Sequence, residues 1–198
     1  MTQPVAATAS FYAGKAAQYA ADTGAFPVPA PLQLFVACLP AGARILELGC
    51  GSGRDSAWML AQGFDVHPTD GIAEMAAEAA KRLPVPVEVL PFDRIEAVAA
   101  YQGVWANACL LHVPRIDLPD IVHRIRRALT PDGVFFASFK AGTGEGYDRL
   151  GRYFNYPDAT FLRNAYGTGW ASLAIDTADG SGYDGAETRW LHVLARRS

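Results

Sequence analysis

The chain has 198 residues, of which 51% are hydrophobic and 19% are charged, and its formal net charge is −3. This length is enough for one domain with a sizeable core, and the composition is typical of a globular protein. The slightly acidic balance argues against a nucleic-acid partner, because proteins that bind nucleic acids usually present a basic face. No stretch approaches the ~20 apolar residues of a membrane span, and residues 1–10 lack the basic start of a secretion signal. We therefore expect no membrane partner and a cytoplasmic location.

Cysteine and histidine are too few and too scattered to indicate a metal site or a disulfide framework. Cys38, Cys50 and Cys109 form no C-x-x-C pair, and the four histidines are equally dispersed. The sequence therefore predicts no metal.

The first predicted element is an alanine-rich helix over residues 6–21, with Tyr12 and Tyr19 on one face. A proline-rich connection follows, and its last proline is well placed to open a second helix over residues 31–39. We expect residues 1–40 to form a helical cover. The two tyrosines either pack as part of an amphipathic helix or face a ligand.

Residues 44–56 read R-I-L-E-L-G-C-G-S-G-R-D-S, which predicts a buried strand, a glycine turn and a helix over residues 55–62. Gly49, Gly51 and Gly53 suit the turn, because glycine tolerates positive φ and lets a ligand approach the backbone. The start of the helix offers unpaired N–H groups to an anionic group.

The glycine spacing distinguishes between ligands. The dinucleotide pattern G-x-G-x-x-G would need glycine at Arg54 or Ser56, so a nicotinamide oxidoreductase is the less favoured alternative. The pattern E-x-G-x-G-x-G, which starts at Glu47, resembles motif I of the class I S-adenosylmethionine-dependent methyltransferases. The resemblance implies that the loop packs on the methionine part of the cofactor and that Glu47 belongs to the binding site.

The second strand, residues 64–70, ends in an acidic residue. Asp70 follows Gly49 at about the 20-residue offset of the ribose-binding acid in Rossmann units, although it could also cap the next helix. Pro68 lies inside this strand and lacks the N–H for a ladder bond, so we expect the pairing to break there.

A helix over residues 72–83 and a third strand over residues 87–90 come next. In the methyltransferase pattern an acid after the third strand lies beside the adenine amino group. The resemblance therefore implicates Asp93, and more weakly Phe92. Asp93 could equally cap a helix predicted over residues 94–100.

The fourth strand and its exit cover residues 103–109, and a loop continues to residue 114. Ligands of open α/β sheets bind outside the carboxyl ends of the strands, where the strand order reverses. We therefore expect Asn107, Ala108 and His112 near the reacting groups. His112 is either a general base or a structural histidine bonded to a carbonyl group, and Cys109 is interpreted as a small buried apolar residue.

A strongly amphipathic helix over residues 118–129 precedes a fifth strand over residues 134–139, with Lys140 at its exit. The glycine-, arginine- and tyrosine-rich segment 141–157 is predicted to be a substrate-side insertion that covers the site. A flexible surface loop is the alternative. Within this segment Arg152 either grips an anionic acceptor or braces the following helix.

A last helix over residues 157–166 and two strands, 171–177 and 188–195, complete the chain. Together with the earlier elements they resemble the α/β fold of the class I methyltransferases. That fold is a Rossmann-like seven-stranded mixed sheet, with an antiparallel last strand and helices on both faces. Residues 1–198 would form a single methyltransferase domain, similar to the small bacterial tellurite-resistance-type enzymes.

The resemblance implies methyl transfer from S-adenosyl-L-methionine to a small-molecule acceptor, with S-adenosyl-L-homocysteine as product and a monomeric or homodimeric enzyme. A noncatalytic cofactor-binding or interaction protein is the alternative. The catalytic candidates are His112, Lys140 and Arg152. The cofactor-binding candidates are Tyr12, Tyr19, Glu47, Gly49, Cys50, Gly51, Gly53, Arg54, Asp70, Gly71, Ile72, Met75, Phe92, Asp93, Asn107 and Ala108.

Overall fold

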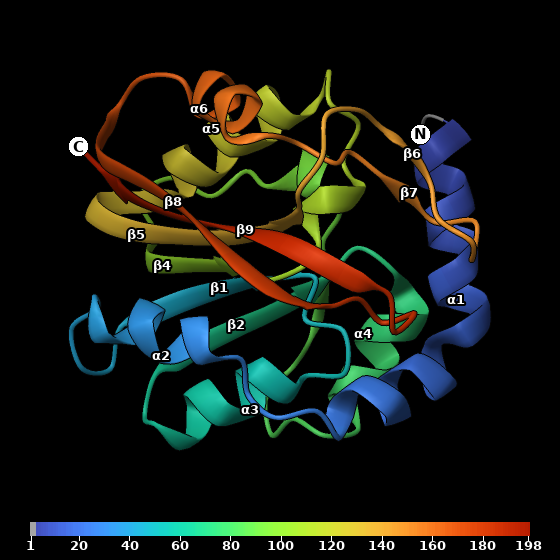
Figure 1. The fold of residues 1–198 in the computed structure, drawn as a ribbon. Helices are drawn as coiled ribbons and strands as arrows, with labels where there is room; N and C mark the ends of the chain where they lie inside the picture. Colours follow the sequence, from blue (N-terminus) through green and yellow to red (C-terminus); the bar gives the residue numbers. More distant parts are fainter. Residues whose placement is uncertain (1–2) are drawn as a thin grey trace.

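The computed structural model describes residues 3–198, with side chains from Ala6 onward, and contains a seven-stranded sheet in the order β3-β2-β1-β4-β5-β9-β8 (Figure 1). The strands are β1 (Arg44–Leu48), β2 (Asp65–Asp70), β3 (Glu88–Val89), β4 (Tyr101–Ala106), β5 (Leu129–Lys140), β8 (Trp170–Ser181) and β9 (Glu187–Arg197). The first five strands pair in parallel, whereas β9 runs antiparallel to both β5 and β8. The predicted mixed sheet with an antiparallel last strand is confirmed.

Helices cover both faces of the sheet. They are α1 (Gln3–Gly24), α2 (Ala30–Ala37), α3 (Arg54–Ala61), α4 (Ala73–Ala80), α5 (Leu118–Ala128) and α6 (Ala159–Tyr166), with 3₁₀ turns η1 (Phe92–Arg94) and η2 (Leu110–His112). Figure 1 shows α2 and α3 on one side of the sheet and α5 and α6 on the other. Within the described residues, no helix is both long enough and apolar enough to cross a bilayer.

Alternation along β5 explains why both faces of the sheet are apolar. Successive side chains of a strand point to opposite faces, so Phe135 packs in the core beneath α5 and α6, while Phe136 packs with Phe35 of α2 and with Trp105 of β4. The Trp105 and Phe136 rings are stacked, with their centroids 4.3 Å apart. Both cores therefore hold the strands rigidly up to their carboxyl ends.

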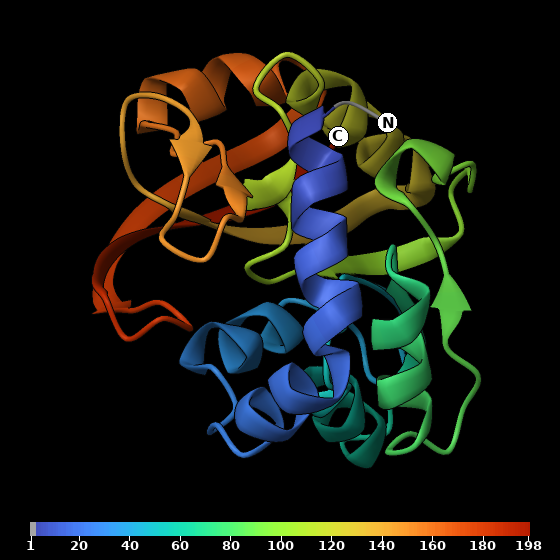
Figure 2. The same ribbon diagram turned by 90° about the vertical axis from the view of Figure 1, so that its right-hand side faces the viewer.

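Helix α1 lies across those carboxyl ends (Figure 2). Its N-terminal half is tied to a small sheet of β6 (Gly146–Tyr147) and β7 (Tyr153–Phe154), because the Tyr153 amide donates to Thr8 Oγ1 over 2.9 Å. Its C-terminal half meets the turn between β8 and β9, where the Tyr183 hydroxyl donates to Asp22 over 2.8 Å. The helix is therefore anchored at both ends above the sheet edge.

The expected break in pairing at Pro68 is wrong. The register between β1 and β2 continues through the pair Glu47↔Pro68 to Leu48↔Thr69. On the outer side, β3 pairs only with Thr69 and Asp70. Because no strand flanks Pro68 on that side, the missing N–H interrupts no ladder.

The helix predicted over residues 94–100 is also wrong, since only the short η1 turn forms there. The Ala99 and Ala100 amides instead donate to the carbonyl groups of Arg127 and Ala128, over 2.9 and 2.8 Å. Ala99 has a φ of +44°, which a helix does not tolerate. The amides of this segment thus bond to the C-terminal carbonyl groups of α5, and the segment forms no helix of its own.

Candidate functional site

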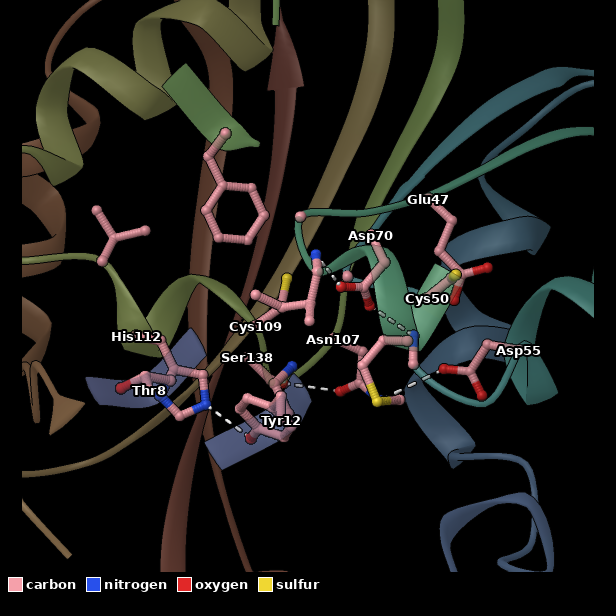
Figure 3. A pocket seen from close by; sticks show the side chains of 18 of the residues that line it. Thr8, Tyr12, Glu47, Cys50, Asp55, Asp70, Asn107, Cys109, His112 and Ser138 are labelled. Atoms are coloured by element: carbon pink, nitrogen blue, oxygen red, sulfur yellow. Dashed lines mark hydrogen bonds between the residues drawn. The ribbon is translucent and has the colours of Figure 1, made fainter. Parts of the chain in front are cut away.

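A cavity of about 1040 Å³ lies at the carboxyl ends of the central strands, between the sheet and α1. Figure 3 shows Glu47, Asp70 and Asn107 projecting toward the same space, with Tyr12 and His112 joined at another side of it. These residues come from α1, from the ends of β1 and β2, and from the segment after β4. The strand order reverses at β1 and β4, so the cavity occupies the switch point expected of a ligand site.

The glycine turn after β1 needs glycine for two reasons. Gly49, Gly51 and Gly53 have φ values of +63°, +58° and +73°, a region that other residues enter only with strain. A Cβ on Gly49 would also lie 2.5 Å from the Cβ of Cys109. Gly53 caps α3 and packs against Leu83, and it does not line the cavity.

Asp70 joins the glycine turn to the start of α4. Its Oδ2 accepts from the Gly51 amide over 3.1 Å, and its Oδ1 accepts from the Ile72 amide over 2.9 Å. Burial raises the pKa of Asp70 to about 6, although the two amide donors oppose that rise. Each oxygen keeps a further lone pair, so the carboxylate can accept additional hydrogen bonds from a ligand in the cavity.

A buried acidic pair lies beneath the turn. Burial, and then the nearby charge of Asp55, raise the pKa of Glu47 well above its usual range, and Ser56 Oγ donates to Glu47. Asp55 accepts from Arg54 Nε over 2.7 Å and from Trp105 Nε1 over 3.0 Å. Burial thus favours the protonated form of Glu47, which can donate a hydrogen bond, and the Asp55 carboxyl group is held in place by Arg54 and Trp105.

Asn107 is positioned from the neighbouring strand. Ser138 of β5 donates to Asn107 Oδ1 over 2.7 Å and accepts from the Ala108 amide, also over 2.7 Å. Asn107 Nδ2 reaches Asp55 over a longer 3.4 Å. Sequence reasoning missed Ser138, although a hydroxyl in the apolar run F-F-A-S-F was a signal that it had a polar partner.

The tautomer of His112 follows from its two contacts. Nδ1 lies 2.6 Å from the Tyr153 carbonyl oxygen, which can only accept, so Nδ1 carries the proton. Burial lowers the pKa of His112 to about 4, which leaves the ring neutral. Nε2 is then an acceptor, and the Tyr12 hydroxyl donates a hydrogen bond to it over 3.0 Å.

Lys140 and Arg152 lie outside the main cavity and line a space of about 40 Å³ behind Tyr12 and His112. Arg152 donates twice to Asp148 Oδ2, from Nη2 over 2.7 Å and from Nε over 3.0 Å. Lys140 Nζ lies 3.9 Å from Asp184, and burial lowers the lysine pKa. Both cations thus have carboxylate partners already.

The structure brings almost all the predicted cofactor residues together, since every one except Gly53 lines the large cavity. His112 lines both cavities. The large cavity is also lined by residues that sequence reasoning did not assign to the site, among them Thr8, Phe26, Pro29, Asp55, Ser138, Tyr183, Trp190 and His192. Phe26 and Pro29 lie on the linker between α1 and α2, and Tyr183, Trp190 and His192 lie on β9 and the turn before it, where no motif marks them.

Comparisons with known proteins agree with this geometry. A family model described as a methyltransferase domain matches residues 19–177. The chain is 34% identical over 107 residues to the S-adenosyl-L-methionine-dependent Diels-Alderase iccD of Talaromyces variabilis, a match that covers 49% of this chain and 36% of that protein. It is 35% identical over 124 residues to trans-aconitate 2-methyltransferase of Variovorax paradoxus (strain S110), covering 58% and 45%. The chain therefore spans less than half the length of these curated relatives.

Among solved structures, the 1,6-didemethyltoxoflavin-N1-methyltransferase of Burkholderia thailandensis superposes with a TM-score of 0.77. The match covers 100% of this chain and 92% of that one at 23% identity, so it supports the fold alone. That protein was solved with 1,6-didemethyltoxoflavin and S-adenosylhomocysteine bound. Because the family model spans most of the chain, including the glycine turn and the strand ends around the cavity, the protein belongs to the methyltransferase domain family.

Proposed function

We propose that the protein transfers a methyl group from S-adenosyl-L-methionine to a small-molecule acceptor. The observation that carries this proposal is the joint placement of the glycine turn and the Asp70 carboxylate at one wall of a cavity of about 1040 Å³. Ligand pockets of roughly 300–1,000 Å³ enclose small molecules, so this one has room for a cofactor and a second compound.

The residues present fit this cofactor. Asp70, at the end of β2, would accept from the ribose hydroxyls, and Phe92 and Asp93 would flank the adenine. The Gly49–Gly51 turn would receive the methionine part, whose charged ends would lie near the carboxyl groups of Glu47 and Asp55. When bound, the cofactor supplies a methyl group on a positively charged sulfur, toward which the tyrosine rings of α1 offer cation–π attraction.

The chain's own groups position the acceptor and exclude water. Helix α1 lies across the strand ends, and its residues Thr8, Tyr12 and Tyr19 line the cavity. Water that a bound cofactor and acceptor displace there would strengthen the polar contacts inside the site. His112 is our proposed general base for an acceptor that carries a proton, because its ring is neutral and Nε2 is an acceptor. Nε2 becomes available when the Tyr12 hydroxyl moves away from it.

Arg152 and Lys140 are proposed to shape the acceptor end from behind Tyr12. Their pairing with Asp148 and Asp184 reduces the charge that either could offer to an anionic acceptor. The carboxylate that Arg152 contacts belongs to its own segment and not to the helix after Pro157, so the pair braces the segment itself. The segment 141–157 remains our proposed cover, since it is tied to α1 through Thr8.

The test is calorimetry with S-adenosylhomocysteine and NAD, followed by an assay of methyl transfer to a panel of acceptors. We expect saturable binding of S-adenosylhomocysteine, no heat with NAD, and release of S-adenosylhomocysteine when the right acceptor is present. Binding of NAD without S-adenosylhomocysteine would contradict the proposal. One relative is a Diels-Alderase, so products must also be checked for added methyl mass, because a cofactor-dependent reaction without methylation would support different chemistry.

Three finer expectations remain proposals. The cysteines are free thiols, which fits a reducing cytoplasm. A monomer or homodimer is our expectation for the assembly. The closer likeness to the tellurite-resistance group stays a prediction that oxyanions of tellurium and selenium in the acceptor panel would test.

A further inference from the structure

One part of the large cavity is lined by the α1–α2 linker, by Ser138 of β5 and by β9 with the turn before it. We name it the acceptor compartment and define it by its lining residues, which are Phe26, Pro29, Pro31, Ser138, Ser181, Tyr183, Trp190 and His192. None of these side chains is an acid, a lysine or an arginine, in contrast to the acidic groups around the turn.

Strand register brings the floor of the compartment together. Ser138 of β5 is paired with His192 of β9, and Trp190 stands two residues before His192, hence on the same face of the sheet. One step back along the same face, Phe136 and Leu194 pack with Val28 and Leu32. The linker of residues 26–31 therefore lies over Ser138 and His192 as a roof.

Aromatic rings form the side wall. The Tyr183 ring lies 4.6 Å from the Tyr19 ring, centroid to centroid, and its hydroxyl bond to Asp22 holds the β8–β9 turn against α1. The Trp190 indole packs under Gly180, where an added Cβ would lie 3.3 Å from the ring. Trp190 thus offers a large apolar surface with a restricted side chain, which suits stacking on a flat ligand, and Tyr183, whose ring centroid also lies 5.6 Å from Arg152 Cζ, borders it.

The nearest cations are already paired. Lys140 Nζ lies near Asp184 and over the Phe154 ring, at 4.5 Å from its centroid, and Arg152 is held by Asp148. Burial also lowers the pKa of His192, so that its ring is neutral at pH 7. An anionic ligand in the compartment would lose its hydration without gaining an unpaired counter-charge, which is costly.

Neutral hydrogen-bonding groups are available on the floor. Among the described residues, none bonds to either ring nitrogen of the half-buried His192. Asn107 Nδ2 has only its long contact to Asp55, and Ser138 Oγ keeps one free lone pair. These groups match donors and acceptors on the edge of an uncharged ring.

We propose that the acceptor compartment binds the methyl acceptor, and that this acceptor is an uncharged, flat aromatic or heteroaromatic ring. The ring stacks on Trp190 and Tyr183 and is hydrogen-bonded at its edge by His192 and Asn107. This inference rests on the proposed methyl transfer and adds to it the substrate class and the place where the substrate sits.

The test is calorimetry on the protein saturated with S-adenosylhomocysteine, with a matched pair of rings. The probes are 4-hydroxyquinoline and its 2-carboxylate derivative, with trans-aconitate as an aliphatic anion. We expect 4-hydroxyquinoline to bind at least about tenfold more tightly than the carboxylate, and trans-aconitate not to bind. Trp190→Ala should weaken the binding of 4-hydroxyquinoline about tenfold, and Trp190→Phe, which keeps a ring, should weaken it by less than about threefold.

Two controls make the result interpretable. His192→Asn should weaken the binding of 4-hydroxyquinoline. His123→Asn, at an exposed position on α5, should leave that affinity unchanged. Unaltered S-adenosylhomocysteine affinity in each variant shows that it has folded. Equal or tighter binding of either anion, binding of neither ring, or full affinity in Trp190→Ala would overturn the inference while leaving the cofactor assignment intact. Failure of S-adenosylhomocysteine itself to bind would instead sink the proposed function and this inference with it.

Discussion

The Tyr12 hydroxyl donates to Nε2 of His112 over 3.0 Å, and the same oxygen accepts from Arg152 Nη1 over 3.3 Å. The first contact joins residues one hundred positions apart. It places His112, our proposed general base, directly behind a tyrosine of α1. Helix α1 and the proposed base are therefore linked, so that a movement of α1 would change access to His112.

The first prediction separates these two residues. His112→Asn keeps a donor toward the Tyr153 carbonyl oxygen but removes the basic nitrogen, so kcat should fall by about 10²–10⁴-fold if His112 is the base. Tyr12→Phe leaves that nitrogen in place and should cost about 1–3 kcal/mol of stability without a comparable loss of kcat. Rates and melting temperatures of both variants give the answer, and an unchanged kcat in His112→Asn would reduce His112 to a structural role.

The second prediction concerns pH. The pKa of Asp70 is raised from 3.8 to about 6, so its protonated form is favoured in the folded protein, and its contribution to stability is lost as pH rises through about 6. The pKa of His112 is lowered from 6.5 to about 4, so its contribution is present above 6.5 and is lost as pH falls toward 4. Between about pH 4 and 6, a rise in pH therefore removes the Asp70 contribution to stability and restores the His112 contribution.

Ligand binding isolates the Asp70 term. Ribose hydroxyls donate more strongly to a carboxylate than to a carboxylic acid, so S-adenosylhomocysteine should bind more tightly as pH rises from 5 to 7.5. Asp70→Asn should weaken binding by about 2–4 kcal/mol at pH 7.5, because two hydroxyls lose a charged acceptor, and should flatten the pH dependence. Affinity within twofold of wild type would show that Asp70 serves only the turn.

The third prediction concerns Arg152. Lysine cannot reproduce its two bonds to Asp148 Oδ2, so Arg152→Lys should lower the melting temperature, equivalent to about 1–3 kcal/mol, and leave S-adenosylhomocysteine affinity unchanged. Arg149→Lys is the matched control, since that side chain is 68% exposed and should change stability little. A raised acceptor KM in folded Arg152→Lys, with no thermal effect, would return this residue to direct acceptor binding.

The fourth prediction concerns the glycine turn. Gly49→Ala places a Cβ against Cys109 at a φ of +63°, so it should abolish measurable S-adenosylhomocysteine binding or prevent folding. Gly144→Ala, with nothing near its added Cβ, should behave like wild type. Circular dichroism separates misfolding from lost binding, and a folded Gly49→Ala protein with normal affinity would mean that the ligand does not approach this turn.

Local pattern was sufficient for the fold and for most of the residues that gather around the glycine turn of the cavity. Apolar runs and glycine spacing are properties of adjacent residues, so the strand–turn–helix around Glu47 and the acid at Asp70 were predictable without coordinates. The error at Pro68 arose because the cost of proline depends on its outer neighbour, and β3 is too short to reach it. The prediction of a helix over residues 94–100 failed because amides of that segment bond to the C-terminal carbonyl groups of α5.

The sequence by itself determined that the chain forms a methyltransferase-type sheet with a glycine turn after its first strand, because hydrophobic periodicity and glycine geometry act over a few residues. Only the tertiary structure decided which polar groups stay free in the site. Lys140 and Arg152 were candidates to hold an anionic acceptor, with bracing of the following helix as the alternative for Arg152. In the structure Asp184 and Asp148 pair with them, while Ser138 and His192 meet through strand register. Charge pairing and cross-strand contact depend on distance in space, which no local pattern in the chain encodes.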